Sequence, residues 1–96
     1  MIRKRYLFSY DIADDKRRAK VFKTLVGLGD HVQFSVFICE LNDKELQVAK
    51  GKVAELIHHR EDQMLIFDMG STEREMDLFL STIGQDLKIS ERVQIV

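Results

Sequence analysis

The sequence predicts a small α+β fold in which two helices lie on one face of a β-sheet. Three observations support this prediction. The chain of 96 residues has room for one domain, residues 1–96. Its apolar and charged fractions, 45% and 32%, are typical of a folded globular protein. Segments with the alternation of a β-strand are separated by two segments with the spacing of an amphipathic helix.

The first half of the chain predicts a strand, a helix and a long second β segment. Residues 6–10 are aromatic and apolar, and the strand they predict ends at Asp11. Asp14 is a candidate N-cap for the helix that follows. That helix is expected to end in residues 27–29, where a glycine can adopt the left-handed conformation that closes a helix. Residues 31–41 alternate for longer than a strand usually runs, so we expect a bend or break near Ser35.

The second half begins with a helix signal and continues as a strand. Asn42 with Glu45 three residues later has the pattern of a capping box, so a helix is expected from residue 42 to about residue 58. Its apolar residues recur at helical spacing. Residues 63–69 then predict a strand that ends at a glycine.

The C-terminal part is less regular. Residues 72–84 fit both strand and helix patterns, and we interpret residues 77–83 as a strand. A short final strand is expected at about residues 92–96. A β-α-β-β-α-β order with helices on one sheet face is the ferredoxin-like arrangement. The final strand exceeds that plan, and the sheet of a partner subunit is the expected place for it.

Charge is unevenly distributed, although the net charge is only −1. Residues 1–23 carry eight Lys and Arg against three Asp, whereas residues 24–96 carry seven against thirteen Asp and Glu. A basic segment of this kind either binds an anionic partner or is a solvated helix face. The charges alone favour neither interpretation.

The remaining composition indicates a cytoplasmic protein with no membrane segment. No apolar stretch approaches the ~20 residues that a membrane span needs. The basic residues 1–5 are not followed by the apolar core of a signal peptide. Cys39 is the single cysteine, which excludes an intrachain disulfide.

Few residues have the pattern of a catalytic or metal site. The sequence has no glycine-rich phosphate loop, no nucleophile elbow and no Cys-x-x-Cys pair. Asp11, Asp14 and Asp15 are carboxylates that a hard cation such as Mg²⁺ prefers. Asp14 and Asp15 are better explained as the cap and first-turn charges of a helix. For Asp11 the composition decides nothing.

Three blocks together carry a resemblance to a known family. The first is residues 6–12 with residues 14–18 behind it, and the second is residues 29–37, where a glycine precedes Val-Gln-x-Ser-Val-Phe. The third and weaker block is residues 83–84 with the closing residues 93–96. In this order and spacing, the chain resembles the CRISPR-associated protein two family, the small endoribonuclease-like component of spacer acquisition.

The resemblance implies a ferredoxin-like homodimer whose final strand packs on the neighbouring subunit. It implies that Asp11 faces its own copy across the interface and that the two carboxylates share one Mg²⁺ per dimer. The physics agrees, because two ionised carboxylates at close range must bind a cation or share a proton. It further implies catalytic roles for Asp11 and Tyr10. The residues expected to bind nucleic acid, by the resemblance or by their place on the basic first helix, are Arg17, Arg18, Lys20, His31, Ser35 and Phe37.

Two of these positions depart from the family pattern. Lys20 and His31 stand where the family often has arginine. Lysine keeps the charge but loses the two-pronged phosphate contact, and histidine is largely neutral at pH 7 unless an anion raises its pKa. Both departures weaken the case for efficient catalysis more than the case for binding. Phe37 has two open interpretations, a platform for base stacking and a filler of the core or interface.

Three hypotheses about function remain. The first is a Mg²⁺-dependent endonuclease that cleaves single-stranded RNA or double-stranded DNA at the dimer interface. The second is a non-catalytic adapter that binds nucleic acid and bridges copies of the CRISPR acquisition integrase. The third is a ferredoxin-like module that senses a small molecule, and its support is the fold alone.

Overall fold

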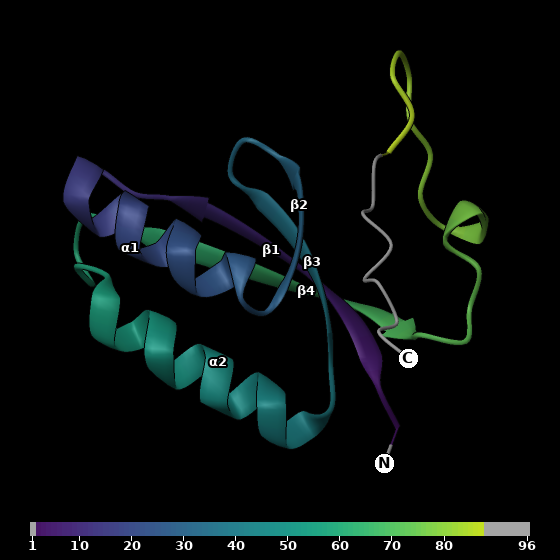
Figure 1. Ribbon diagram of the computed structural model, residues 1–96, viewed down its shortest axis with the longest axis horizontal. Helices are drawn as coiled ribbons and strands as arrows, with labels where there is room; N and C mark the ends of the chain where they lie inside the picture. The colour runs from purple at the N-terminus through teal and green to yellow at the C-terminus, as the bar shows by residue number, and fades with distance from the viewer. Residues whose placement is uncertain (1, 88–96) are drawn as a thin grey trace.

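The computed structural model describes residues 2–87 and has the α+β fold that the sequence predicts. Its four strands form one sheet in the order β2-β3-β1-β4, and every neighbouring pair is antiparallel. Both helices lie on the same face of this sheet, which is the ferredoxin-like arrangement (Figure 1). The elements in chain order are β1 (Lys4–Asp11), α1 (Asp15–Val26), β2 (Gly29–Gln33), β3 (Val36–Leu41), α2 (Asp43–Leu56), β4 (Gln63–Ser71) and a 3-10 helix (Met76–Leu78).

The central strand β1 divides its side chains between the two faces of the sheet. Tyr6, Phe8 and Tyr10 are buried in the core between the sheet and the helices. Successive side chains of a strand point to opposite faces. Ser9 and Asp11 therefore belong to the face opposite the helices. Asp11 is the last residue of the central strand β1, and it lies close to the first turns of α1 and to the β2–β3 turn.

Helix α1 begins as predicted and ends differently. The Asp14 carboxylate accepts a hydrogen bond of 2.9 Å from the backbone N–H of Arg17, which confirms the predicted N-cap. Gly27, however, has φ −74°, so no left-handed residue closes the helix there. Gly29 is required for another reason. A Cβ at this position would lie 2.5 Å from the Sγ of Cys39, so only glycine allows β2 to approach β3 this closely.

The break expected near Ser35 is confirmed. β2 and β3 form an antiparallel hairpin, and Phe34 and Ser35 are the two residues of its turn. Two-residue hairpin turns commonly contain residues at positive φ. Among the described residues, only glycines have positive φ, and the pairing register shifts between His31 and Gln33 instead. Such a bulge re-aims the residues that follow it.

Helix α2 has the predicted capping box. The backbone N–H of Glu45 donates to Asn42 Oδ1 at 2.8 Å, and the backbone N–H of Asn42 donates to Glu45 Oε1 at 2.9 Å. The helix ends at Leu56, close to the expected residue 58. Its buried residues recur at helical spacing, as predicted.

The strand predicted over residues 77–83 is wrong. Residues 76–78 form a short 3-10 helix, and no strand follows it up to residue 87. The backbone N–H groups of Phe79 and Leu80 both donate to the carbonyl of Met76. The helical pattern of these apolar residues therefore prevails locally over their alternation. The strand predicted at residues 92–96 lies outside the described residues.

Within residues 2–87, no helix combines the length and the apolar character that a membrane crossing needs.

Candidate functional site

An open hollow of about 620 Å³ lies where the end of β1 meets the β2–β3 turn and the first turns of α1. The backbone N–H of Tyr10 donates to the carbonyl of Ser35 at 3.1 Å, which ties the turn to β1. The structure thus brings together predicted residues from three separate segments. The residues that line the hollow are Tyr10, Asp11, Ile12, Arg18, Phe34 and Ser35.

Asp11 contributes one exposed carboxylate to this hollow. Its Cα pairs with that of Gln63 at the very end of the β1–β4 ladder. Of its two neighbouring carboxylates, Asp14 caps α1 and Asp15 pairs with Arg18, as expected for residues at a helix start. Within residues 2–87 of one chain, no three His, Cys, Asp or Glu side chains gather closely enough to hold a metal ion.

Arg18 brings a guanidinium group to the wall of the hollow. Its Nη2 donates to the backbone carbonyl of Ile12 at 2.9 Å, and its Nη1 donates to Asp15 Oδ1 at 2.7 Å. The bond to the carbonyl orients the planar group. The Asp15 carboxylate is highly exposed, so this ion pair is weak and an incoming phosphate can compete for the guanidinium.

Tyr10 lies at the inner side of the hollow and is largely buried. Its ring stacks with that of Phe37 at a centroid distance of 6.4 Å. Burial raises the pKa of the Tyr10 phenol, and the nearby Arg18 opposes this only in part. The phenol is therefore neutral at physiological pH and is suited to donating a hydrogen bond.

Arg17 does not line the hollow, because its guanidinium is held by a carboxylate on the far side of the turn. Its Nε and Nη2 donate to the two oxygens of Asp62 at 2.7 and 3.1 Å. The same carboxylate accepts hydrogen bonds from the backbone N–H groups of Ala13 and His58. Arg17, followed by these two amides, holds the pKa of Asp62 well below its usual range. Asp62 thus fastens the β1–α1 turn to the segment before β4.

Asp62 is a residue that the sequence reasoning missed. A single aspartate before a strand carries no pattern that marks it, and two of its partners, Ala13 and Arg17, lie more than forty positions away in the chain. Phe34 was also missed as a member of the site. It occupies the unspecified position of the Val-Gln-x-Ser-Val-Phe block, and only the fold of the hairpin places it beside Asp11.

His31 and Phe37 form an aromatic cluster beneath the hairpin turn. The Phe37 ring is fully buried, and the His31 ring stacks on it at 4.8 Å with an interplanar angle of 26°. Phe22 meets both rings edge-on. Of the two interpretations of Phe37, the structure supports core filling, because a base cannot stack on a ring without exposed surface. His31 Nε2 lies 3.2 Å from the carbonyl oxygen of Phe34.

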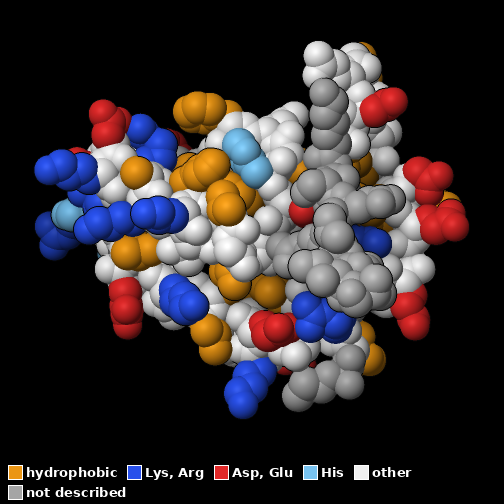
Figure 2. Space-filling model, in the orientation of Figure 1, with side chains coloured by type: hydrophobic (Ala, Val, Ile, Leu, Met, Phe, Trp, Pro, Cys, Tyr) orange, Lys and Arg blue, Asp and Glu red, His pale blue; other side chains and the backbone are white. Residues whose placement is uncertain are grey.

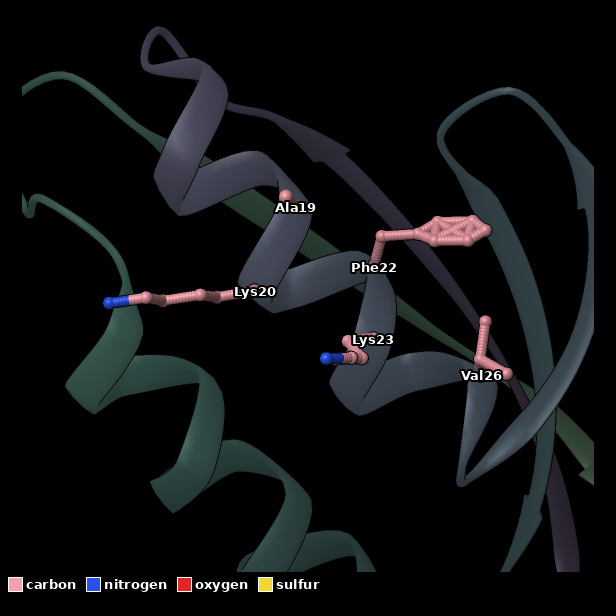
Figure 3. Close-up of a pocket in the computed structure, with 5 residues that line it drawn as sticks. All are labelled: Ala19, Lys20, Phe22, Lys23 and Val26. Atoms are coloured by element: carbon pink, nitrogen blue, oxygen red, sulfur yellow. The ribbon is translucent and has the colours of Figure 1, made fainter.

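Lys20 lines a different hollow, of about 440 Å³, along α1. Figure 3 shows Lys20 and Phe22 extending to opposite sides of the helix. Lys and Arg side chains gather over the end of the molecule where α1 begins (Figure 2). Lys20 therefore lines this second hollow and not the hollow at Asp11.

The sheet face opposite the helices carries an apolar strip, which we define as Leu7, Ile38, Leu65 and Phe67. The register places Leu7 between Ile38 on β3 and Phe67 on β4. The side chains of Leu65 and Phe67 are 44% and 55% exposed. An exposed apolar surface on a strand face is typical of an association surface. Asp11 lies on this same face.

The chain is similar to proteins of one family over most of its length. Residues 4–77 match the family model described as CRISPR associated protein Cas2. A curated relative from Rhodospirillum rubrum, named CRISPR-associated endoribonuclease Cas2 1, is 39% identical over 92 residues, which cover 95% of this chain and 88% of the relative. Another from Thermodesulfovibrio yellowstonii, named CRISPR-associated endoribonuclease Cas2 2, is 41% identical over 90 residues, which cover 94% and 93%.

Solved structures share the fold. The crystal structure of Streptococcus pyogenes Cas2 at pH 6.5 matches with a TM-score of 0.73 and 26% identity, covering 83% of this chain and 99% of that one. A crystal structure of a hypothetical protein from Thermus thermophilus matches with a TM-score of 0.72 and 27% identity, covering 90% and 99%. The resemblance predicted from the sequence is confirmed, and the chain belongs to the CRISPR-associated protein Cas2 family.

Proposed function

We propose that this chain is a metal-dependent endoribonuclease of CRISPR adaptation that cleaves phosphodiester bonds at the interface of a homodimer. The observation that carries the proposal is the hollow in which Asp11, Arg18 and Ser35 meet. A carboxylate, a guanidinium and a hydroxyl are the groups that phosphodiester cleavage needs at one place. Relatives that match nearly the whole chain are named endoribonucleases, which supports the same reaction class.

The apolar strip supports the dimer. Leu65 and Phe67 expose apolar surface that a second copy can cover. A two-fold contact brings identical patches of the two copies together. Asp11 lies on the same sheet face as the strip, so a two-fold axis that passes close to the end of β1 would bring the two Asp11 carboxylates toward one another.

The donor set fits one Mg²⁺ ion between the two copies. An exposed carboxylate oxygen is a ligand that Mg²⁺ prefers, and the ion usually needs only one or two protein carboxylates. Two Asp11 side chains would supply them. Held by these carboxylates, the ion would supply an activated water as nucleophile and would offset charge on the phosphodiester.

The other residues of the hollow bind and orient the nucleic acid. Arg18 binds a phosphate through its planar guanidinium, which the Ile12 carbonyl already holds in place. Ser35 presents a hydroxyl beside it. Tyr10 has a raised pKa because it is buried, so it remains protonated and donates a hydrogen bond rather than acting as a general base.

The alternative is a non-catalytic adapter that binds duplex DNA and bridges the acquisition integrase. Two observations favour it. Arg17 is engaged by Asp62, and Lys20 and His31 do not line the hollow, so few of the predicted residues converge on Asp11. In this alternative the basic surface at α1 binds the phosphate backbone, and Asp11 is an interface residue.

The deciding experiment is cleavage of labelled single-stranded RNA and duplex DNA, each with Mg²⁺ and with EDTA. It compares the native protein with Asp11→Asn and with the matched control Asp43→Asn. Asp43 is also an exposed carboxylate, but it lies near Lys4, at the opposite end of β1.

We expect Mg²⁺-dependent cleavage of RNA that Asp11→Asn abolishes and Asp43→Asn retains. If the native protein cleaves neither substrate and all three proteins bind nucleic acid in a salt-sensitive way, the nuclease proposal is rejected in favour of the adapter. Equal cleavage by native protein and Asp11→Asn would remove Asp11 from the reaction.

A further inference from the structure

Phe34 is the aromatic side chain that the hairpin presents at the edge of the Asp11 hollow. It is 84% exposed and lines the same hollow as Asp11, Arg18 and Ser35. In Figure 2 a hydrophobic group stands out from the surface over the β2–β3 turn. Phe34 is not part of the core cluster, and it lines an open hollow together with polar and charged side chains, which is the kind of setting in which ligands bind.

The backbone under Phe34 is fixed on both sides. The carbonyl of Ser35 accepts a hydrogen bond of 3.1 Å from Tyr10 N–H on β1. The carbonyl of Phe34 lies 3.2 Å from Nε2 of His31, whose ring in turn stacks on the buried Phe37. Because these contacts hold the backbone of the turn, little backbone freedom is lost when a ligand covers the ring.

We propose that Phe34 is a stacking platform for one base of a single-stranded nucleic acid whose phosphate lies against Arg18. The inference rests on the proposed function and adds a specificity determinant to it. Unpaired bases have a free face that can stack on an aromatic ring, whereas the base faces of a duplex are covered by their neighbours. The platform therefore favours single strands over duplexes at this site.

The charges of the hollow favour a nucleotide over an apolar partner. The hollow that Phe34 lines is also lined by Arg18, Asp11 and Ser35, which carry a guanidinium, a carboxylate and a hydroxyl group. A protein partner that covered the ring with apolar side chains would have to desolvate these groups without replacing their hydrogen bonds. A nucleotide offers a flat base for the ring and a phosphate for the guanidinium.

The test measures binding without cleavage. Fluorescence anisotropy in EDTA, with a labelled oligoribonucleotide of about 12 nucleotides and with duplex DNA, compares the native protein with Phe34→Ala, Phe34→Leu and Phe34→Tyr. Leucine keeps the apolar character and loses the flat ring, while tyrosine keeps the ring. Stacking on one base predicts that Phe34→Ala and Phe34→Leu weaken RNA affinity between about five-fold and about 150-fold. Phe34→Tyr retains it, and duplex affinity changes little.

Two further measurements make the result decisive. An RNA with one abasic position at the stacking site should bind the native protein more weakly than intact RNA does. Phe34→Ala should bind the abasic RNA and the intact RNA equally well. Sedimentation at equal concentration should give the same oligomeric state for native protein and variants. A loss of affinity that accompanies dissociation of the oligomer would make Phe34 an interface residue and overturn the proposal, as would equal RNA affinity of all four proteins.

The proposal and the nuclease function fail in different ways. RNA binding that depends on Phe34 without any cleavage in Mg²⁺ would overturn the nuclease and keep the platform. Mg²⁺-dependent RNA cleavage with affinity and rate unchanged in Phe34→Ala would keep the nuclease and overturn the platform.

Discussion

Phe37 offers a direct test of whether a ring in this cluster serves the core or the nucleic acid. Its side chain is fully buried, and its ring centroid lies 4.8–6.4 Å from those of Tyr10, Phe22 and His31. Replacing a buried phenylalanine by alanine costs about 3–5 kcal/mol, because it removes apolar contacts and leaves a cavity. A domain of this length has only about 5–14 kcal/mol of total stability.

Phe37→Ala should therefore lose a large part of the stability of the fold. Each kcal/mol lowers the midpoint of thermal unfolding by about 4–8 °C in a domain of this size, so we expect a fall of about 12 °C or more. Phe37→Leu keeps most of the volume and should lose clearly less. The assay is circular dichroism during heating at one fixed protein concentration, because association also shifts the midpoint.

RNA binding of Phe37→Leu, measured well below its unfolding midpoint, should match that of the native protein. Phe34→Leu provides the contrast, since its ring is exposed: its midpoint should be unchanged and its RNA affinity reduced. A Phe37→Leu protein with a native midpoint and lost RNA binding would refute the reasoning, because the ring would then contact the nucleic acid.

The remaining predictions concern the turn at Asp62 and two glycines. Folding lowers the pKa of Asp62, so its contribution to stability is full above about pH 5 and is lost as the pH falls below the ordinary value of about 3.9. Urea unfolding midpoints of the native protein should therefore fall more steeply between about pH 5 and pH 3 than those of Asp62→Asn, and parallel curves would contradict this. Gly29→Ala should destabilise by about 1–3 kcal/mol, because the new Cβ lies 2.5 Å from Cys39 Sγ and the strands must separate. A Cβ added at Gly51 in α2 would meet nothing within 4 Å, so Gly51→Ala should stabilise the fold by about 0.5–1 kcal/mol in the same urea titration. Stability changes of the same sign in Gly29→Ala and Gly51→Ala would contradict the packing argument.

Local signals in the sequence predicted the start of each helix. The cap at Asp14 and the capping box of Asn42 and Glu45 involve partners only three residues apart. Interactions at this range form in the same way whatever the rest of the chain does. The same holds for the break at Ser35, because an alternating run that is too long for one strand must turn back on itself.

The 3-10 helix at residues 76–78 shows where local signals were insufficient. Leu78, Leu80 and Thr82 alternate as a strand would, while a second set also has helical spacing: Met76, Phe79, Leu80 and Ile83. A strand forms only where a neighbouring strand can pair with it. β4 is an edge strand of the described sheet, yet residues 72–87 do not pair with it, and no local signal in the sequence decides whether such pairing occurs.

The candidate site could be predicted only in part. The residue pattern left Asp11 undecided, and the family resemblance supplied Asp11, Tyr10, Arg18 and Ser35, which do line one hollow. The burial of Phe37 and the place of Phe34 in the hollow were not predictable. The face of the sheet on which a strand residue lies depends on the pairing register. The register shifts between His31 and Gln33, and this shift changes the direction in which the residues of the following turn point.

The sequence by itself determined the fold class, the order of the elements as far as β4, the N-terminal caps of both helices and the family. These follow from contacts within a few residues or from blocks that can be compared along the chain. The tertiary structure alone decided which basic residues reach Asp11. It engaged Arg17 with Asp62, placed Arg18 at the wall of the hollow, and left Lys20 on another surface. Neighbouring positions of a helix point in directions about 100° apart, so residues that are adjacent in the sequence meet different partners once the helix packs on the sheet.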